Sequence, residues 1–186
     1  MSSKIEEVTI LGVDPGTNIM GYSLLRIVGK QTDVVEMNVI QIKHINSPMA
    51  KLKFIFDKIE VLILKYHPTI LAIEAPFYGK NPQSMLKLGR AQGVVISACL
   101  HHGLEIFEYA PRKIKQSITG RGSASKEQVA AMLKNMYHFE EIPKYLDATD
   151  ALAVATCYHL QYKISTNEKK FSSWDSFLAK NKDRIV

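Results

Sequence analysis

Two acidic residues of this chain stand at the ends of apolar, β-prone segments. Asp14 follows the apolar run in "TILGV", and a Pro-Gly pair comes directly after it. Glu74 ends the apolar run in "TILAIEAPF", and a proline again follows closely. Turn chemistry explains Asp14 when it is taken alone, because an Asp before Pro-Gly commonly opens a turn.

A second pair of acids, Asp147 and Asp150, lies in the segment "DATDALAVATCYHL". Their spacing of three residues places both side chains on one face of the helix that this segment predicts. A helix N-cap and a favourable interaction with the helix dipole explain the pair without any catalytic role. The four acids can form a single functional site only if the fold brings them together.

The elements that must position these acids follow from the apolar patterns. Strand-like runs are expected at about 8–14, 20–28 and 34–43. Pro-Gly and Gly-Lys turns between them favour an antiparallel meander. Apolar residues recur at helical spacing from about 49 to 66, and Pro68 ends that helix before the strand in "TILAIEAPF".

A right-handed crossover through this helix would lay the fourth strand beside the first. The fifth strand, "LEIFEYA", then completes a five-stranded mixed sheet of order 3-2-1-4-5, flanked by helices in an α/β fold. In that order the ends of the first and fourth strands are neighbours, about 5 Å apart. We therefore expect Asp14 and Glu74 to face each other at one edge of the sheet.

Four converging carboxylates indicate a metal site. Crowded acids repel one another and resist ionisation unless cations lie among them. Oxygen ligands with open positions suit Mg²⁺ or Mn²⁺, and two such ions roughly 4 Å apart are a known arrangement for cleaving a phosphodiester. The six histidines show no metal-ligand spacing, and no serine or cysteine nucleophile signature is present.

The rest of the chain predicts further helices and a tail. Helices are expected from about 82 to 102, after Pro111, after a capping box at Ser125 and Gln128, and from about Tyr145. No internal repeat or linker divides the chain, so one domain is expected over residues 1–162. The segment 163–186 is polar and charged apart from a small aromatic cluster, and it is expected to be a weakly ordered tail or a short docking helix.

The chain carries a basic surplus, with 24 Lys and Arg against 18 Asp and Glu and a formal net charge of +6. Part of it gathers in the acid-free stretch 110–126, which contains Arg112, Lys113, Lys115, Arg121 and Lys126. A solvated loop and helix face would explain this stretch. A nucleic-acid partner would explain it as well.

Other features of the sequence bear on the cellular location of the protein. No apolar run approaches the roughly 20 residues that a membrane span requires, and the segment "MSSKIEEVTI" shows no secretory signal. Cys99 and Cys157 lie in apolar helical patterns, which is typical of reduced core residues. A cytoplasmic location is expected, with no membrane partner.

Several motifs, in order, resemble the RuvC family of Holliday junction resolvases. They are "ILGVDPGTNIMGYSLL", "AIEAPFYGKNPQSMLKLGRAQGV", "FEYAPRKIKQSITGRGSASKEQV" and "DATDALAVA", and the likeness is collinear from about Val8 to Leu160. The resemblance implies a ribonuclease H-like fold, which agrees with the strand order above. It also implies a nuclease domain over 1–162 with these metal-binding catalytic acids: Asp14, Glu74, Asp147 and Asp150.

The resemblance and the basic stretch together suggest a set of DNA-binding residues. These are Phe77, Tyr78, Arg112, Lys115, Arg121 and Lys126. Phe77 matches an aromatic residue that, in the family, wedges against bases at the junction centre, and Tyr78 is expected to support it. Lys115 and Lys126 match basic residues that approach the DNA backbone near the scissile phosphate.

The activity that the resemblance implies is Mg²⁺-dependent resolution of four-way DNA junctions in recombination and repair, with two ions per subunit and Mn²⁺ as a substitute. One ion would activate water and the other would stabilise the leaving 3′-oxygen, so each nick would carry a 5′-phosphate and a 3′-hydroxyl. Because a four-way junction is pseudo-two-fold, a C2 homodimer would place two sites on opposing strands. The family resemblance also suggests contact with proteins of the branch-migration complex.

Three other functions fit parts of the sequence. The segment "GVDPGTNIMGYS" also reads like the phosphate loop of an actin- or sugar-kinase-type ATPase, although that fold needs a second such loop and a longer chain. The others are a related nuclease that processes RNA and a non-catalytic junction-binding module. Mg²⁺-dependent nicking of a synthetic four-way junction, compared with linear duplex, separates these functions.

Overall fold

Five strands form one mixed β-sheet in the computed structural model, which describes residues 7–76 and 81–168. The spatial order is β3-β2-β1-β4-β5, so the predicted order is confirmed. The strand bounds are β1 Glu7–Asp14, β2 Ile19–Val28, β3 Gln31–Gln41, β4 Ile70–Glu74 and β5 Glu105–Tyr109. Strands β1, β2 and β3 pair antiparallel, whereas β4 pairs parallel with both β1 and β5.

Strand β3 begins earlier than the predicted start at 34. Gly29 adopts a φ of 60° in the turn, and Val28 already pairs with Gln31 across the hairpin. A glycine takes this left-handed backbone without strain, so the chain reverses within two residues. The first residues of β3 are polar, and for that reason the apolar pattern did not reveal them.

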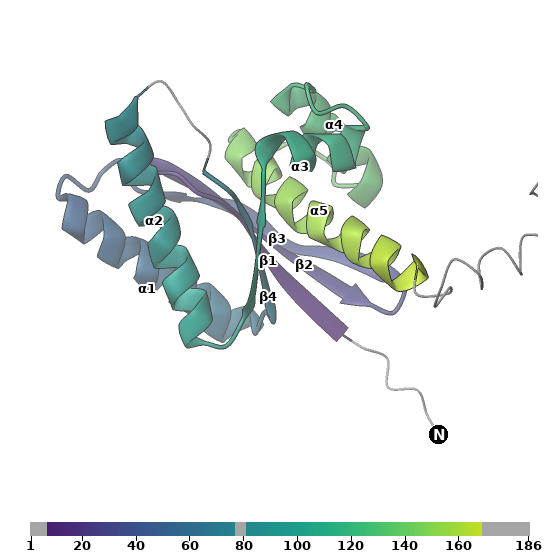
Figure 1. The fold of residues 1–186 in the computed structure, drawn as a ribbon, viewed down its shortest axis with the longest axis horizontal. Helices are drawn as coiled ribbons and strands as arrows, with labels where there is room; N and C mark the ends of the chain where they lie inside the picture. Colours follow the sequence, from purple (N-terminus) through teal and green to yellow (C-terminus); the bar gives the residue numbers. More distant parts are fainter. Residues whose placement is uncertain (1–6, 77–80, 169–186) are drawn as a thin grey trace, which may run out of the picture.

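Helices cover both faces of the sheet (Figure 1). Helices α1 and α2 lie on one face, and α3, α4 and α5 lie on the other. Their bounds are α1 Pro48–Tyr66, α2 Pro82–His101, α3 Pro111–Thr119, α4 Lys126–Tyr137 and α5 Leu146–Glu168. The structure is therefore a three-layer α/β arrangement with the sheet in the middle.

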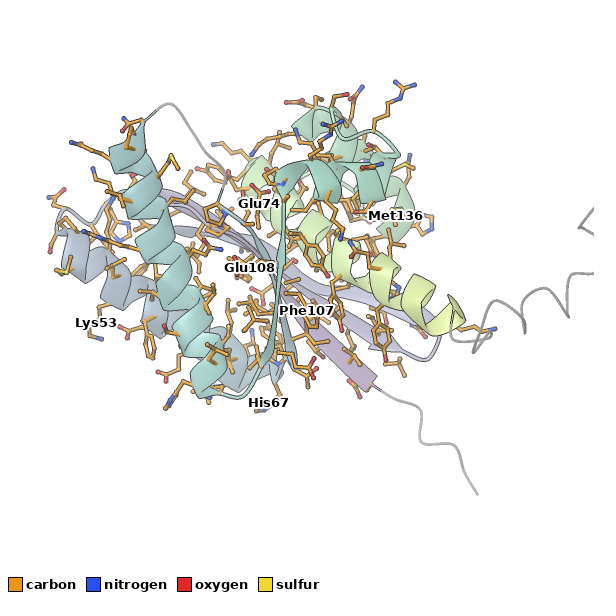
Figure 2. All side chains as sticks on the ribbon, viewed as in Figure 1. Lys53, His67, Glu74, Phe107, Glu108 and Met136 are labelled. Carbon is orange, nitrogen blue, oxygen red and sulfur yellow. The ribbon has the colours of Figure 1, made fainter. Side chains whose placement is uncertain are left out.

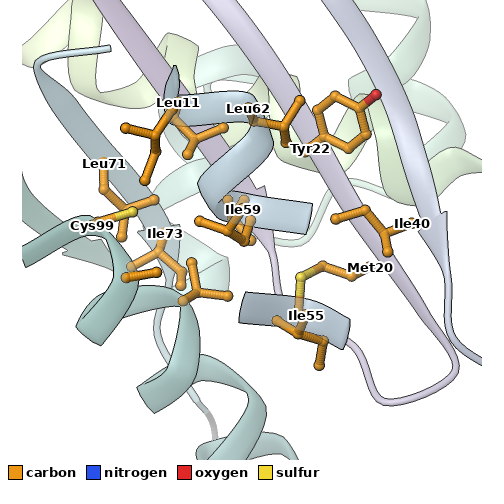
Figure 3. Close-up of a cluster of buried hydrophobic side chains, with 14 of the residues drawn as sticks. Leu11, Met20, Tyr22, Ile40, Ile55, Ile59, Leu62, Leu71, Ile73 and Cys99 are labelled. Atoms are coloured by element: carbon orange, nitrogen blue, oxygen red, sulfur yellow. The ribbon is translucent and has the colours of Figure 1, made fainter. Parts of the chain in front are cut away.

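Alternate residues of the strands face opposite layers, because the side chains of a β-strand alternate with a period of two. Leu11 and Ile73 belong to the cluster that packs under α1 and α2 (Figure 3), and Val13 is part of the same cluster. Ile10 and Ala72 belong to the cluster under α3, α4 and α5. By the same alternation, the even-numbered acids that end β1 and β4 face the layer of α5.

Helix α5 is the central element of that layer, and it is buried on nearly all sides. Small residues let it approach the sheet closely: a Cβ added at Gly12 would meet the backbone oxygen of Ala151 at 2.3 Å. The helix continues to Glu168, beyond the expected domain boundary at 162. The chain remains regular for longer than the polar composition after 162 indicated.

Helix α4 begins at the predicted capping box. The Ser125 hydroxyl accepts from the backbone N–H of Gln128, and the Gln128 side chain accepts from the backbone N–H of Ser125. Both cysteines are buried and free, as predicted. Among the residues that the structure describes, no helix has the length and apolar character needed to cross a bilayer.

Candidate active site

The four predicted acids meet in one cavity of about 390 Å³. It opens where β1 and β4 end and where α5 begins, and Figure 2 shows Glu74 at this end of the sheet, with His67 at the opposite end. Of the residues that the structure describes, the charged ones in its wall are Asp14, Glu74, Lys115, Lys126, Asp147 and Asp150. These residues combine four carboxylates with two ammonium groups.

The strand register sets Asp14 beside Glu74. Val13 pairs with Ile73 in the parallel β1–β4 ladder, so the next residue of each strand is an acid. Parallel strands end at the same edge of a sheet, and such an edge is where α/β folds bind ligands. The register thus places the two strand-end acids side by side, as predicted.

The start of α5 brings Asp147 and Asp150 over the same edge. Gly21, the cross-strand partner of Asp14, lies directly beneath this turn, because a Cβ added there would meet the backbone oxygen of Asp147 at 1.8 Å. The helix begins at Leu146, so Asp147 lies inside its first turn and not at its N-cap. The cap explanation for Asp147 is therefore wrong, although an acid in the first turn still interacts well with the helix dipole.

Burial and mutual repulsion disfavour ionisation of these acids. Burial raises the pKa of Asp14 to about 8, with smaller increases from the charges of Glu74 and Asp150. Burial, and then the charge of Asp150, raises the pKa of Glu74 to about 7. The pKa of Asp150 is also raised, again mainly by burial. A cavity that holds carboxylates at such pKa values favours any cation that can enter it.

Lys126 supplies one positive charge inside the cavity. Its Nζ donates to Oδ2 of Asp150 in a short ion pair. Burial lowers the pKa of Lys126, but the hydrogen bond to Asp150 and the nearby acids outweigh burial and raise it overall. Lys115 also lines the cavity, and its charge opposes the increase in the pKa of Glu74.

The donor set suits a hard divalent cation, because carboxylate oxygens are the ligands that Mg²⁺ and Mn²⁺ prefer. The site is open, however. Within residues 7–76 and 81–168, no three Asp, Glu, His or Cys side chains lie close enough together to hold an ion as they stand. The residues present fit a metal in chemistry and placement, and binding an ion would require these side chains to draw together.

The other predicted DNA-binding residues lie outside this cavity. Arg112 and Arg121 are exposed and are not part of its wall. Phe77 and Tyr78 fall outside the residues that the structure describes, so their expected role at the junction centre stays a prediction.

Sequence reasoning missed Gln92 on α2, which is 4% exposed and lines the same cavity. Its Nε2 donates to Oε2 of Glu108 at 2.8 Å and to the backbone oxygen of Glu74 at 3.5 Å. Gln92 thus ties α2 to the end of β4. The signal for it was a polar residue on the apolar face of the helix, between Ala91 and Val95.

The five-stranded sheet and its carboxylate cavity define an α/β protein of the ribonuclease H-like nuclease class. The comparisons agree on a narrower group. A family model described as Crossover junction endodeoxyribonuclease RuvC matches residues 10–158. The chain belongs to the RuvC family of crossover junction endodeoxyribonucleases.

Relatives and solved structures point to the same family. A RuvC of Cytophaga hutchinsonii is 53% identical over 184 residues, which cover 99% of this chain and 91% of the relative. A RuvC of Bacteroides fragilis is 50% identical, with both chains covered in full. The Thermus thermophilus RuvC structure superposes with a TM-score of 0.77 at 25% identity and covers 86% of this chain and 98% of its own. A second structure, T. thermophilus RuvC in complex with Holliday junction substrate, gives a TM-score of 0.79 at 24% identity, covers 86% of this chain and 97% of its own, and supports the fold.

Proposed function

We propose that Asp14, Glu74, Asp147 and Asp150 are the catalytic acids of a Mg²⁺-dependent nuclease that nicks four-way DNA junctions. The observation that supports this most directly is the convergence of the four carboxylates in one cavity, where burial and repulsion raise the pKa of Asp14 to about 8. Two Mg²⁺ ions bound there, or Mn²⁺ in their place, would supply an activated water and a counter-charge for the leaving 3′-oxygen. Each nick would carry a 5′-phosphate and a 3′-hydroxyl.

The four acids reach that site from different elements of the fold. Asp14 lies centrally, because the charges of Glu74, Asp150 and Asp147 all act on it. Glu74 approaches from the end of β4, and Asp147 and Asp150 approach from the start of α5. Rigid elements position ligands better than loops do, so strand ends and a helix start favour fixed metal positions.

Lys126 and Lys115 place positive charge at the same cavity. We assign them to the phosphates that flank the cut, with Arg112 and Arg121 as exposed contacts farther along the DNA. If Asp150 held a metal ion, its ion pair with Lys126 would weaken, and the ammonium would be available for a phosphate. Phe77 and Tyr78 complete the proposed DNA contacts from outside the described residues.

The substrate and the assembly are part of the same proposal. A structural neighbour is described as T. thermophilus RuvC in complex with Holliday junction substrate, which supports junction DNA as the substrate here. Two nicks placed symmetrically on a two-fold junction need two active sites, so the protein acts as a C2 homodimer. Proteins of the branch-migration complex are its expected partners. Two buried free cysteines support a cytoplasmic setting.

Helix α2 offers the face for that dimer. Leu86 is 66% exposed and Leu100 is 58% exposed. Gly89 and Gly93 lie between them, and no neighbouring atom of the described residues lies within 4 Å of a Cβ added at either glycine. These residues recur at near-heptad spacing on the side of α2 that faces away from the core. Two copies of α2 could therefore approach closely along this apolar stripe.

Isosteric substitutions test the catalytic acids. Asp14→Asn and Glu74→Gln keep size but remove a metal-binding charge, and a loss of about 3–4 kcal/mol of transition-state stabilisation lowers the nicking rate several hundredfold. Junction binding in Ca²⁺ is expected to survive, because it rests on Lys and Arg. The measurement is Mg²⁺-dependent nicking of a synthetic four-way junction, beside binding of the same junction in Ca²⁺.

Glu108→Gln is the matched control. Glu108 lies on the neighbouring strand β5, is exposed, and does not line the cavity. Its substitution is expected to leave nicking within about twofold, since glutamine keeps a partner for Gln92. Near-normal nicking by Asp14→Asn or Glu74→Gln would remove the catalytic assignment, and equal cleavage of linear duplex would remove the junction as substrate.

A further inference from the structure

The β1–β2 turn separates two cavities. Asp14 and Pro15 line the acid cavity described above, whereas Thr17 and Asn18 line a second cavity of about 350 Å³. The remaining walls of the second cavity come from Asn46 and from the N-terminal halves of α1 and α2, which lie side by side on one face of the sheet (Figure 1). We refer to it as the basic cavity.

The basic cavity is lined by cations without acids. Lys51, Lys87 and Arg90 are in its wall, and none of its lining residues is an Asp or a Glu. None of these three side chains takes part in an ion pair among the described residues. Neither α1 nor α2 has an acidic residue in its first turn. The uncompensated charge makes this cavity attractive to an anion.

Lys51 holds the turn that lies between the two cavities. Its Nζ donates to the backbone oxygen of Thr17 at 3.0 Å and to Oδ1 of Asn18 at 3.4 Å. Both acceptors are neutral, so neither offsets the positive charge of the ammonium that fixes the turn after Asp14. An anion bound beside Lys51 would therefore lie at a set position relative to the catalytic acids.

We propose that the basic cavity binds a backbone phosphate of the same DNA strand that enters the acid cavity. This inference rests on the proposed function, since it presumes that DNA is cut beside Asp14. A strand that crosses the β1–β2 turn carries one charge for about every 3.4 Å of duplex axis, so a phosphate reaches the basic cavity within a few nucleotides of the cut. The bound phosphate fixes the register of the strand over the acids.

Lys87 and Arg90 have the spacing and chemistry for this contact. They are three residues apart on α2, so they lie on neighbouring positions of one helix face. A guanidinium binds two phosphate oxygens at once, and an ammonium adds a point charge. Both side chains are exposed, and their charge can reach the DNA without a change in the core.

The first experiment compares two double variants that lose equal charge. Lys87→Ala/Arg90→Ala removes two cations from the basic cavity, and Lys30→Ala/Lys58→Ala removes two exposed cations that do not line it. The dissociation constant for a fixed four-way junction is measured in Ca²⁺ over a range of salt. The first variant is expected to bind at least about tenfold more weakly, with a log–log salt slope smaller by about 1. The control is expected to change less than about threefold, and both variants should melt like the wild type.

The second experiment locates the phosphate on the DNA. A neutral methylphosphonate linkage is moved along the cut strand, one position at a time, and junction binding is measured at each position. For the wild type, one position within a few nucleotides of the cut is expected to weaken binding. For Lys87→Ala/Arg90→Ala, the same position is expected to have no further effect, because the contact is already lost.

Two results would overturn the inference. One is equal loss of affinity in the two double variants, which would reduce the basic cavity to general surface charge. The other is a methylphosphonate profile that Lys87→Ala/Arg90→Ala leaves unchanged. Nicking of the junction by the wild type is measured separately. If the wild type nicks normally and either of these results is found, the phosphate site in the basic cavity is rejected, whereas the proposed function is not.

Discussion

The protonation of single carboxyl groups makes the stability of the metal-free protein depend on pH. Burial raises the pKa of Asp14 to about 8 and that of Glu74 to about 7, whereas in the unfolded chain both release their protons near pH 4. Between these values the native state holds protons that the unfolded state has lost, so stability falls as pH rises. In EDTA, the free energy of unfolding should therefore decrease from pH 5 to pH 8, by up to about 1.4 kcal/mol per pH unit for each fully protonated group.

Urea unfolding of the wild type and of Asp14→Asn tests this dependence. The substitution removes the titrating group, so the variant should be more stable than the wild type at pH 8 and show a shallower slope. Mg²⁺ should stabilise the wild type most at high pH, because metal binds the deprotonated acids. A wild type whose stability in EDTA does not change from pH 5 to pH 8 would show that these acids are ionised without metal.

The meeting of Asp14 and Glu74 could be predicted because it needs only strand order and alternation. The ion pair of Lys126 with Asp150 could not, since the packing of α4 against α5 decides which of several basic residues reaches the cavity. Arg121, equally basic and nearby in the sequence, does not line the cavity. Charge in a sequence indicates a kind of partner, whereas placement in the cavity depends on tertiary packing.

At the scale of elements, the close contact of α5 with the sheet sets the position of two acids. A Cβ at Gly21 would lie 1.8 Å from the backbone oxygen of Asp147, and backbone cannot move aside as a flexible side chain can. Gly21→Ala should therefore displace the first turn of α5, destabilise the fold by about 1–3 kcal/mol and lower nicking at least tenfold. Junction binding in Ca²⁺ should remain, because the basic residues stay in place.

Nicking by Gly21→Ala is measured at a temperature where urea unfolding shows the variant to be fully folded. That condition separates a displaced site from a smaller folded population. Wild-type stability together with wild-type nicking would contradict the close contact. The sequence alone did not reveal this role, because a glycine in an apolar strand also fits a bulge or a weak point in the sheet.

A polar cluster fastens α1 to the sheet. Tyr22 Oη donates to Glu36 at 2.5 Å, Tyr66 also donates to Glu36, and Lys65 lies 3.6 Å from the same carboxylate. The hydrogen bond from Tyr22, and then that from Tyr66, lowers the pKa of Glu36. A lowered pKa means that the stabilisation is complete above about pH 4.5 and is lost as pH falls through the folded-state pKa.

Glu36→Gln should consequently destabilise the protein by about 1–3 kcal/mol at pH 7, as expected for hydrogen bonds to a charged group. The cost should shrink as pH falls through the lowered folded-state pKa of Glu36, because the wild-type carboxyl then also becomes neutral. Asp57→Asn is the control, because the ion pair of Asp57 within the described part of the chain is an exposed i,i+4 pair with Lys53, and its loss should cost less than about 0.5 kcal/mol. Equal costs for the two substitutions in urea unfolding, or a Glu36→Gln cost that does not change with pH, would contradict this account.

At the scale of the whole molecule, the two layers of helices have different tasks. The layer of α3, α4 and α5 supplies Lys115, Lys126 and two of the acids to the cavity. The layer of α1 and α2 supplies the basic cavity and the apolar stripe on α2. Gln92 bridges them, since it contacts the end of β4 from within α2. If the dimer forms through α2, the buried side chain of Gln92 would connect the dimer interface with the end of β4 that carries Glu74.

The dimer can be tested by placing a charge in the stripe. Leu86 is 66% exposed on α2, and Leu86→Arg would bury two like charges near each other if two copies of α2 meet there. An unpaired buried charge is costly, so the dimer dissociation constant should rise at least tenfold in sedimentation equilibrium. Met136→Arg is the control, because Met136 is exposed on α4 in the opposite layer (Figure 2).

The effect on cutting follows from symmetry. A monomer carries one active site, so Leu86→Arg should nick one strand of the junction and lose the paired second nick, while Met136→Arg should keep both. A supercoiled plasmid with an extruded cruciform reports the difference, since paired nicks linearise it and single nicks only relax it. The Leu86→Arg sample should relax the plasmid at protein concentrations where the wild type linearises it, and the two should converge as the concentration rises, because mass action restores the dimer. The contrary result is linear product from Leu86→Arg at concentrations where sedimentation shows only monomer. It would mean that paired nicking does not need a dimer formed through α2.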